Sequence, residues 1–159
     1  MKKIFLGLLA VGMVGLAFTS VTDKEVVKVD IANTVNADVT ADGINFFKGT
    51  WESALEKAES EGKLIFLDAY ASWCGPCKRM AATTFKNKEV GEFFNKYFIN
   101  FKMDMEKHKD GRRLSQKYRL TAYPTLYFID ASESIFHKSV GSLNNSQAIS
   151  FGKEALAKQ

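Results

Sequence analysis

The chain has only two cysteines, Cys74 and Cys77, and Gly75 and Pro76 separate them. They follow an apolar run at 64–67 and precede a segment with helical spacing, which predicts a turn from a strand into a helix. Proline suits the first helical turn, where an N–H is not needed. Cys74 would then lie at the helix N-terminus, where free N–H groups and the helix dipole favour an exposed thiolate. With a more shielded partner one turn further on, this arrangement suits thiol-disulfide exchange.

Other uses of the cysteine pair fit the sequence less well. A structural disulfide across four residues closes too short a loop to constrain the unfolded chain much. A zinc site needs further ligands, and the two histidines, His108 and His137, stand 29 residues apart with no second cysteine pair. Haem attachment requires a histidine where Lys78 stands. We therefore expect a redox-active Cys74–Cys77 disulfide, with no metal and no cofactor.

Length and composition fit one domain behind an export signal. The 159 residues are 46% hydrophobic, enough for a full core. Two lysines precede an uncharged apolar run at 4–18, which is typical of a secretory signal and shorter than a bilayer span. Because its cleavage site is weak, residues 1–19 are predicted to be a signal peptide or an N-terminal membrane anchor. Residues 20–43 are predicted to be a linker, in which 27–31 fits an edge strand or an extended tether, and 44–159 to be the domain.

The charge pattern argues against a nucleic-acid partner. The formal net charge is +4, and loss of residues 1–19 with their two lysines leaves +2. The basic run at 102–119 is interleaved with Asp104, Glu106 and Asp110, which is typical of a solvated helix face. An exported protein whose two cysteines share one reactive motif does not use disulfides as staples. Disulfide-containing exported proteins are therefore the expected partners.

The remaining pattern predicts strands that alternate with helices. Apolar residues at helical spacing predict helices at 51–61, 75–83, 88–97, 110–119 and from 144 or 146 to about 158. Strand patterns cover 63–70, 98–105, 125–129 and 134–140, and the last two are predicted to form a hairpin. Such an order is typical of an α/β fold with a central mixed sheet and helices on both faces.

Two apolar patterns indicate core side chains. A helical stripe is predicted to be core rather than a ligand site, and it comprises Val90, Phe93, Phe94 and Tyr97. Alternation in the second strand is predicted to place four residues on one face, namely Ile99, Phe101, Met103 and Met105.

The motif Trp-Cys-Gly-Pro-Cys-Lys at 73–78, the Tyr-Pro-Thr within 117–125, and Gly141 after the last predicted strand resemble the thioredoxin superfamily. The resemblance covers about 44–159. With the export signal, it is greatest to the secreted, single-domain thioredoxin-like proteins of bacteria. It implies a thioredoxin-like fold and thiol-disulfide oxidoreductase activity.

The resemblance implies how a substrate docks. Pro124 would follow a cis peptide bond opposite the dithiol, so that the backbone of Tyr123 could pair with an extended substrate. Trp73 would shield the dithiol and, with Gly75 and Pro76, form part of the docking surface. The alternatives are an ordinary edge-strand proline and a tryptophan that only packs. Tyr123 and the residues just before the motif depart from thioredoxin, which leaves the partner open.

Asp68, six residues before the first cysteine, falls inside a predicted buried strand, where burial raises the pKa of a carboxyl group. In thioredoxins the matching acid lies beneath the second sulfur, which implies that Asp68 accepts the Cys77 proton. The alternative is an acid that only pairs structurally with Lys102. Lys102 resembles the lysine near this acid in the family, although the charged segment 106–113 lengthens the spacing to Pro124.

These observations together predict an exported, monomeric thiol-disulfide oxidoreductase, periplasmic or otherwise extracytoplasmic. The Cys74 thiolate would attack a disulfide, and Cys77 would displace the reduced product. The Gly-Pro pair in the motif resembles reducing family members, so we expect a protein-disulfide reductase recharged by a membrane electron donor. The alternatives are a thiol oxidase or isomerase, and a thioredoxin-fold binding or chaperone module whose dithiol is secondary.

Overall fold

The computed structural model describes residues 42–159, so the predicted signal or anchor and most of the predicted linker, including 27–31, lie outside it. The elements are α1 (Trp51–Glu61), β1 (Ile65–Tyr70), α2 (Gly75–Ala82), the 3-10 helix η2 (Thr84–Lys86), α3 (Lys88–Tyr97), β2 (Ile99–Asp104), α4 (Gly111–Lys117), β3 (Thr125–Ile129), β4 (Ile135–Val140) and α5 (Asn145–Leu156). Their order confirms the prediction, except that η2 was not foreseen. Within 42–159, none of the helices combines the length and hydrophobicity of a membrane span.

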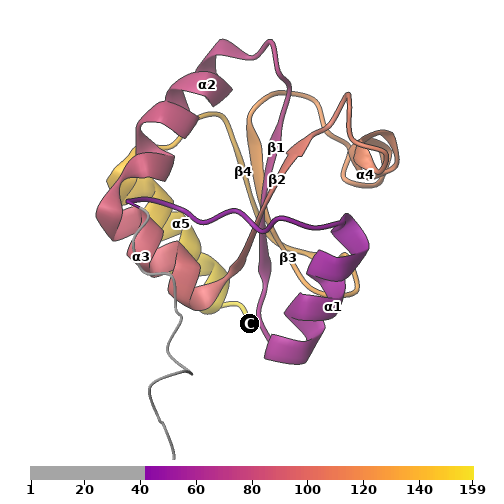
Figure 1. The fold of residues 1–159 in the computed structure, drawn as a ribbon, viewed down its shortest axis with the longest axis horizontal. Coiled ribbons are helices and arrows are strands. Elements are labelled where there is room, and N and C mark those ends of the chain that lie inside the picture. The colour runs from indigo at the N-terminus through magenta and orange to yellow at the C-terminus, as the bar shows by residue number, and fades with distance from the viewer. Residues whose placement is uncertain (1–41) are drawn as a thin grey trace, which may run out of the picture. The chain divides into compact units, whose positions relative to one another are not determined.

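The four strands form one mixed sheet in the order β2-β1-β3-β4. β1 pairs with β2 in parallel and with β3 antiparallel, and β3 and β4 form the predicted hairpin. β1 is therefore central, which explains its continuous apolar run. Figure 1 shows α2, α3 and α5 on one face of the sheet and α1 and α4 on the other. The predicted α/β thioredoxin fold is thus confirmed.

Side-chain caps determine where the helices begin. Thr50 and Asn87 each accept a hydrogen bond from the backbone N–H three residues further on, at the starts of α1 and α3. Asn144 and Gln147 form a reciprocal capping box at the start of α5. Gly62 ends α1 with a φ of 61°, a left-handed conformation that glycine adopts readily.

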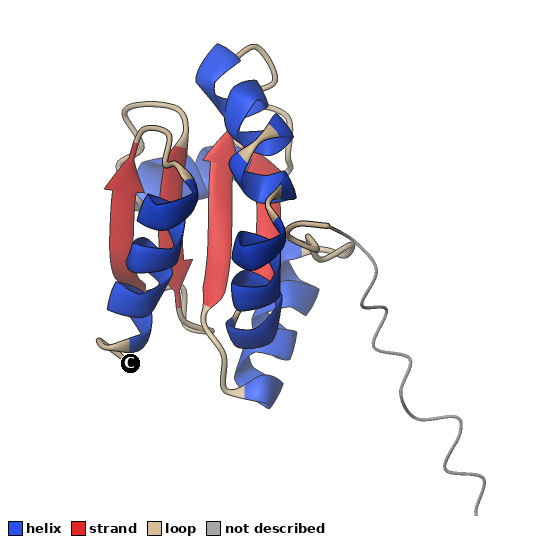
Figure 2. Ribbon diagram, turned by 90° about the vertical axis from the view of Figure 1, so that its left-hand side faces the viewer, coloured by secondary structure: helices blue, strands red, loops and turns tan. Residues whose placement is uncertain are grey.

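The core lies in two layers, one on each side of the sheet. Figure 2 views the molecule from the side that α2, α3 and α5 cover, where the aromatic residues of α3 pack against β1 and β3. The predicted stripe on α3 is core at Val90 and Phe94, but Phe93 is only half-buried, and Tyr97, the last residue of the helix, is 37% exposed. The predicted face of the second strand is confirmed in the other layer, where its four residues pack together with α1 and α4.

Candidate active site

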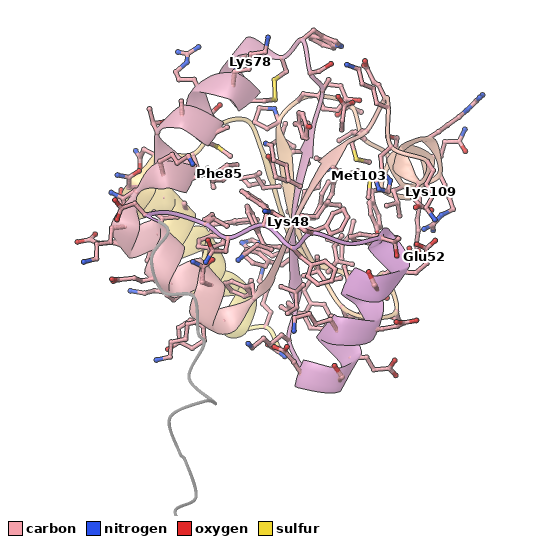
Figure 3. The ribbon with its side chains drawn as sticks, viewed as in Figure 1. Lys48, Glu52, Lys78, Phe85, Met103 and Lys109 are labelled. Atoms are coloured by element: carbon pink, nitrogen blue, oxygen red, sulfur yellow. A yellow bond between two sulfur atoms is a disulfide. The ribbon has the colours of Figure 1, made fainter. Side chains whose placement is uncertain are left out.

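Cys74 and Cys77 form a disulfide at the N-terminal end of α2, with an S–S distance of 2.03 Å. Figure 3 shows it at the upper end of this helix, next to the labelled Lys78. Cys74 is the N-cap, and its Sγ accepts a hydrogen bond from the Cys77 N–H over 3.1 Å. Pro76 occupies the first turn. The helix N-terminus is therefore directed at the Cys74 sulfur, where the same contact would stabilise a thiolate.

Both sulfurs are covered in the disulfide form. Cys74 is 2% exposed and Cys77 is 3% exposed, so the predicted difference between an exposed and a shielded sulfur is wrong for this form. Ala71 completes the buried cluster, and the side chains of Tyr70 and Tyr123 pack against it. Two tyrosines at positions that depart from the usual thioredoxin sequence thus pack against the disulfide cluster.

Trp73 presents most of its surface to solvent beside the disulfide. It is 67% exposed, its Nε1–H donates to Glu106 Oε2 over 2.9 Å, and its ring meets Tyr123 edge-on at 5.8 Å between centroids. Glu106 comes from the segment between β2 and α4. The sequence indicated Glu106 only as one charge on a solvated face, and no local motif marks its contact with Trp73.

The peptide bond between Tyr123 and Pro124 is cis, as the resemblance implied. The Pro124 carbonyl accepts a hydrogen bond from the Gly141 N–H over 2.8 Å. Tyr123, Pro124, Gly141 and Pro76 help to line an open groove of about 920 Å³ between α2 and the start of α5. Gly75 is exposed at the start of α2 and does not line the groove. Neither the N–H nor the C=O of Tyr123 has a backbone partner within 42–159.

Asp68 lies in the middle of β1 and is 1% exposed. It is in register with Lys102 of β2, whose ammonium donates to Asp68 Oδ2, while Oδ1 has no partner among the residues described. Burial raises the pKa of Asp68, against the opposing effect of the Lys102 charge. Side chains alternate along a strand, so Asp68 shares a face with Phe66, which belongs to the same core layer as Met80 of α2. The carboxyl group therefore faces the helix that carries the cysteines.

Most of the predicted solvated basic run is neutralised by acids. Arg113 and Lys117 of α4 bind Glu133 in the turn between β3 and β4, at 2.7 Å each. The Trp51 Nε1–H donates to the same carboxylate over 2.6 Å. The hydrogen bonds from Arg113 are the main cause that lowers the pKa of Glu133 to about 2. This cluster joins the turn to α1 and α4 and is a structural feature that the sequence did not indicate.

Comparisons with known proteins agree with this geometry. The model of the family described as Thioredox_DsbH, a protein of unknown function (DUF255), matches residues 20–136. The solution structure of a candidate disulphide-isomerase from Bacteroides thetaiotaomicron is 41% identical, with a TM-score of 0.65, and the match covers 75% of this chain and 98% of that chain.

Two curated relatives match over part of their length. Thioredoxin-1 of Drosophila melanogaster is 34% identical over 70 residues, which are 44% of this chain and 60% of that protein. The thiol:disulfide interchange protein DsbD of Pseudomonas fluorescens is 30% identical over 119 residues, which are 72% of this chain and 20% of that protein. The chain thus spans less than two thirds of either relative.

Proposed function

This chain belongs to the Thioredox_DsbH family, and we propose that it is a thiol-disulfide oxidoreductase that reduces disulfides of proteins outside the cytoplasm. One observation carries the proposal: Cys74 is at once half of the disulfide and the N-cap of α2, with its Sγ accepting the Cys77 N–H. A thiolate in that position forms at lower pH than a free thiol, and the thiolate is the species that attacks a disulfide.

The reaction starts from the reduced pair. The Cys74 thiolate attacks one sulfur of the target disulfide, whose S–S bond breaks, and the other target sulfur leaves as a thiolate and takes up a proton. Cys77 then loses its proton and attacks Cys74 Sγ, which releases the second target sulfur as a thiol. The target gains two electrons, and the Cys74–Cys77 pair loses two as its disulfide forms.

Asp68 is the proposed acceptor of the Cys77 proton. Two observations support this role: Asp68 is buried on the face covered by α2, and its Oδ1 has no hydrogen-bond partner within the described part of the chain. Lys102 supports the ionised carboxylate through its bond to Oδ2. Because burial favours the protonated form, this acid can hold a proton at a pH where an exposed aspartate would not.

A target segment docks beside the disulfide as an added strand. The backbone groups of Tyr123, which have no backbone partner within 42–159, lie next to the cis Pro124 and are available to an extended peptide. The exposed Trp73 flanks this position, and Gly75 and Pro76 present the exposed start of α2. The groove beyond Pro76 accommodates the rest of the segment.

The proposed location is outside the cytoplasm, and the proposed source of electrons is a membrane donor. The apolar run at 4–18 after two lysines supports a signal peptide or anchor at 1–19, with 20–43 as the linker and 44–159 as the working domain. Similarity to DsbD, a thiol:disulfide interchange protein, supports a partner that passes on electrons by dithiol exchange. We propose that the protein acts as a monomer.

Trapping of the mixed disulfide tests this function. In Cys77→Ser, the first attack proceeds and resolution does not, so target proteins should remain bound to Cys74 and be released by a reductant. Cys74→Ser is the matched control and should trap nothing. If Cys77→Ser traps no more protein from an extracytoplasmic extract than Cys74→Ser, the exchange mechanism is wrong.

A disulfide isomerase is the second candidate, because the relative with 41% identity is a candidate disulphide-isomerase. An isomerase rearranges disulfides without net consumption of electrons, whereas a reductase consumes one pair for each disulfide. Reactivation of a scrambled disulfide protein without added reductant, by a catalytic amount of the protein, would favour the isomerase.

A further inference from the structure

Three aromatic rings lie close to the Lys102 ammonium, which also binds Asp68. The ammonium lies 4.1 Å from the centroid of the Tyr70 ring, 5.5 Å from that of Phe85 and 5.8 Å from that of Phe46. Figure 3 shows Phe85 on the α2 side of the sheet, where the disulfide also lies. Tyr70 is the nearest of the three rings and is well within the distance at which a ring face attracts a cation.

Tyr70 also lies beside the residues of the disulfide. Its side chain packs against the buried cluster of Ala71, Cys74 and Cys77. The same ring therefore contacts the cation that pairs with Asp68 and packs against the cluster that holds the reacting cysteines.

We propose that Tyr70 is a positioning residue for the exchange reaction, and that its ring face holds the Lys102 ammonium against Asp68 beside the dithiol. The inference rests on the proposed role of Asp68 as the proton acceptor. It adds to that role the group that keeps the counter-charge in place.

The surroundings of Lys102 explain why such a group is needed. A quarter of the Lys102 side chain is exposed, so the ammonium can turn towards water instead of the buried carboxylate. Asp68 is its only acceptor among the residues described, because the other nearby groups are rings. A further charged neighbour is Asp104, which is in register with Tyr70 on β2 and whose charge acts on the Tyr70 hydroxyl. The helix α2 covers this face of the sheet and carries Cys77, which is a free thiol in the reduced form.

A weaker hold on Lys102 changes how Asp68 titrates. Without the ring, the ammonium hydrates, its attraction for the carboxylate falls, and Asp68 keeps its proton to higher pH. The pH at which half of the Asp68 carboxyl groups are ionised should then increase by about one unit. The pH at which mixed-disulfide resolution becomes faster should increase by about the same amount.

The test follows the Asp68 carboxyl carbon by NMR against pH in the reduced, full-length protein. Tyr70→Leu should raise the midpoint by about one unit, whereas Tyr70→Phe, which keeps the ring face, should stay within about 0.3 units. Tyr97→Leu is the matched control, because Tyr97 holds Lys96 at 5.0 Å and is exposed. An unchanged midpoint in Tyr70→Leu would overturn the proposal.

Two further measurements separate the ring's charge distribution from its packing. In a Lys102→Gln background, Tyr70→Leu should add no further shift, and a shift of the same size in both backgrounds would contradict the inference.

If Tyr70→Leu does not fold, pentafluorophenylalanine at position 70 keeps the ring's shape but removes its negative face. That protein should show the raised midpoint, and a midpoint equal to that of Tyr70→Phe would contradict the proposal.

The role of Asp68 itself is tested separately. Asp68→Asn should remove the pH-dependent rise in resolution, measured with a synthetic peptide that carries one disulfide. If Asp68→Asn leaves this profile unchanged, the proposed proton acceptor is wrong, whatever the NMR titrations show. If Asp68→Asn removes the rise and Tyr70→Leu leaves both the profile and the midpoint unchanged, only the inference about Tyr70 fails.

Discussion

The Trp73 indole donates to Glu106 Oε2 over 2.9 Å, across 33 positions of sequence. An acid from the segment before α4 thus holds the exposed tryptophan next to the first cysteine. The indole is held at one end by this hydrogen bond and packs against the Tyr123 ring in a T-shaped arrangement. The surface that a partner meets is therefore ordered before binding, which lowers the entropy cost of docking.

Removal of Glu106 should loosen this surface without affecting the chemistry. Glu106→Ala is expected to raise the KM for a protein disulfide about two- to tenfold, the worth of one hydrogen bond, with kcat unchanged. Steady-state reduction of a protein substrate, coupled to an excess of chemical reductant, measures both constants. Glu92→Ala, at another exposed acid on α3, is the control and should match the wild type. A fall in kcat alone would contradict the assigned role.

Asp68 should make the oxidised protein less stable as the pH rises. Burial raises the pKa of Asp68 in the folded state. The contribution of Asp68 to the free energy of unfolding is therefore largest below the ordinary pKa of an aspartate, and it is lost as the pH rises through the raised pKa. The Asp68→Asn variant has no ionisable group at this position, so its free energy of unfolding should not show this fall. It should be more stable than the wild type by about 1–3 kcal/mol at pH 8, with the difference closing near pH 4.

Urea denaturation with the disulfide intact measures this effect, because the thiols then do not titrate. Glu56→Gln, an exposed acid on α1, serves as the control and should show no such trend. A wild type that is more stable than Asp68→Asn at pH 8 would mean that the Lys102 pair outweighs the cost of burial.

Glu133 should show the opposite dependence on pH. Its pKa of about 2 in the folded protein lies below that of an unfolded glutamate, so its stabilisation is present above about pH 4 and is lost as the pH falls towards 2. Glu133→Gln should cost about 1–3 kcal/mol at pH 7, because it weakens the bonds from Trp51, Arg113 and Lys117.

Thermal unfolding at pH 7 and pH 3 checks the Glu133 prediction. The exposed pair of Glu52 and Lys109 offers a contrast, since Glu52→Gln should leave the unfolding temperature unchanged. Equal losses in Glu133→Gln and Glu52→Gln would show that the Glu133 cluster stabilises no more than a surface ion pair.

Local signals in the sequence predicted most of the fold. The starts of α1, α3 and α5 follow from Thr50, Asn87 and Asn144, which cap helices through contacts only three residues away. The central position of β1 follows from its continuous apolar run, because both of its faces are covered. Such signals depend on neighbours in sequence, and for that reason they can be found without the structure.

The less predictable parts of the site depend on distant residues. The cover of the sulfurs by Tyr70 and Tyr123, and the contact of Trp73 with Glu106, form only once the loops after β1 and β2 and before β3 meet at one end of the sheet. Glu133 is 82 residues from Trp51, and nothing around either residue marks their contact. The lysine beside Asp68 was indicated only by the resemblance, and the register of β1 and β2 brings the two together.

The reduction potential of the Cys74/Cys77 couple tests the central claim most directly. It is measured by equilibrating the protein with thiol and disulfide buffers of known ratio. At each ratio, the fraction of the protein in which both cysteines are reduced is determined. The account predicts a reducing couple, at about −270 to −220 mV, which can donate electrons to disulfides in an oxidising compartment. A value more positive than about −180 mV would contradict it, since such a couple accepts electrons from the targets that a reductase must reduce.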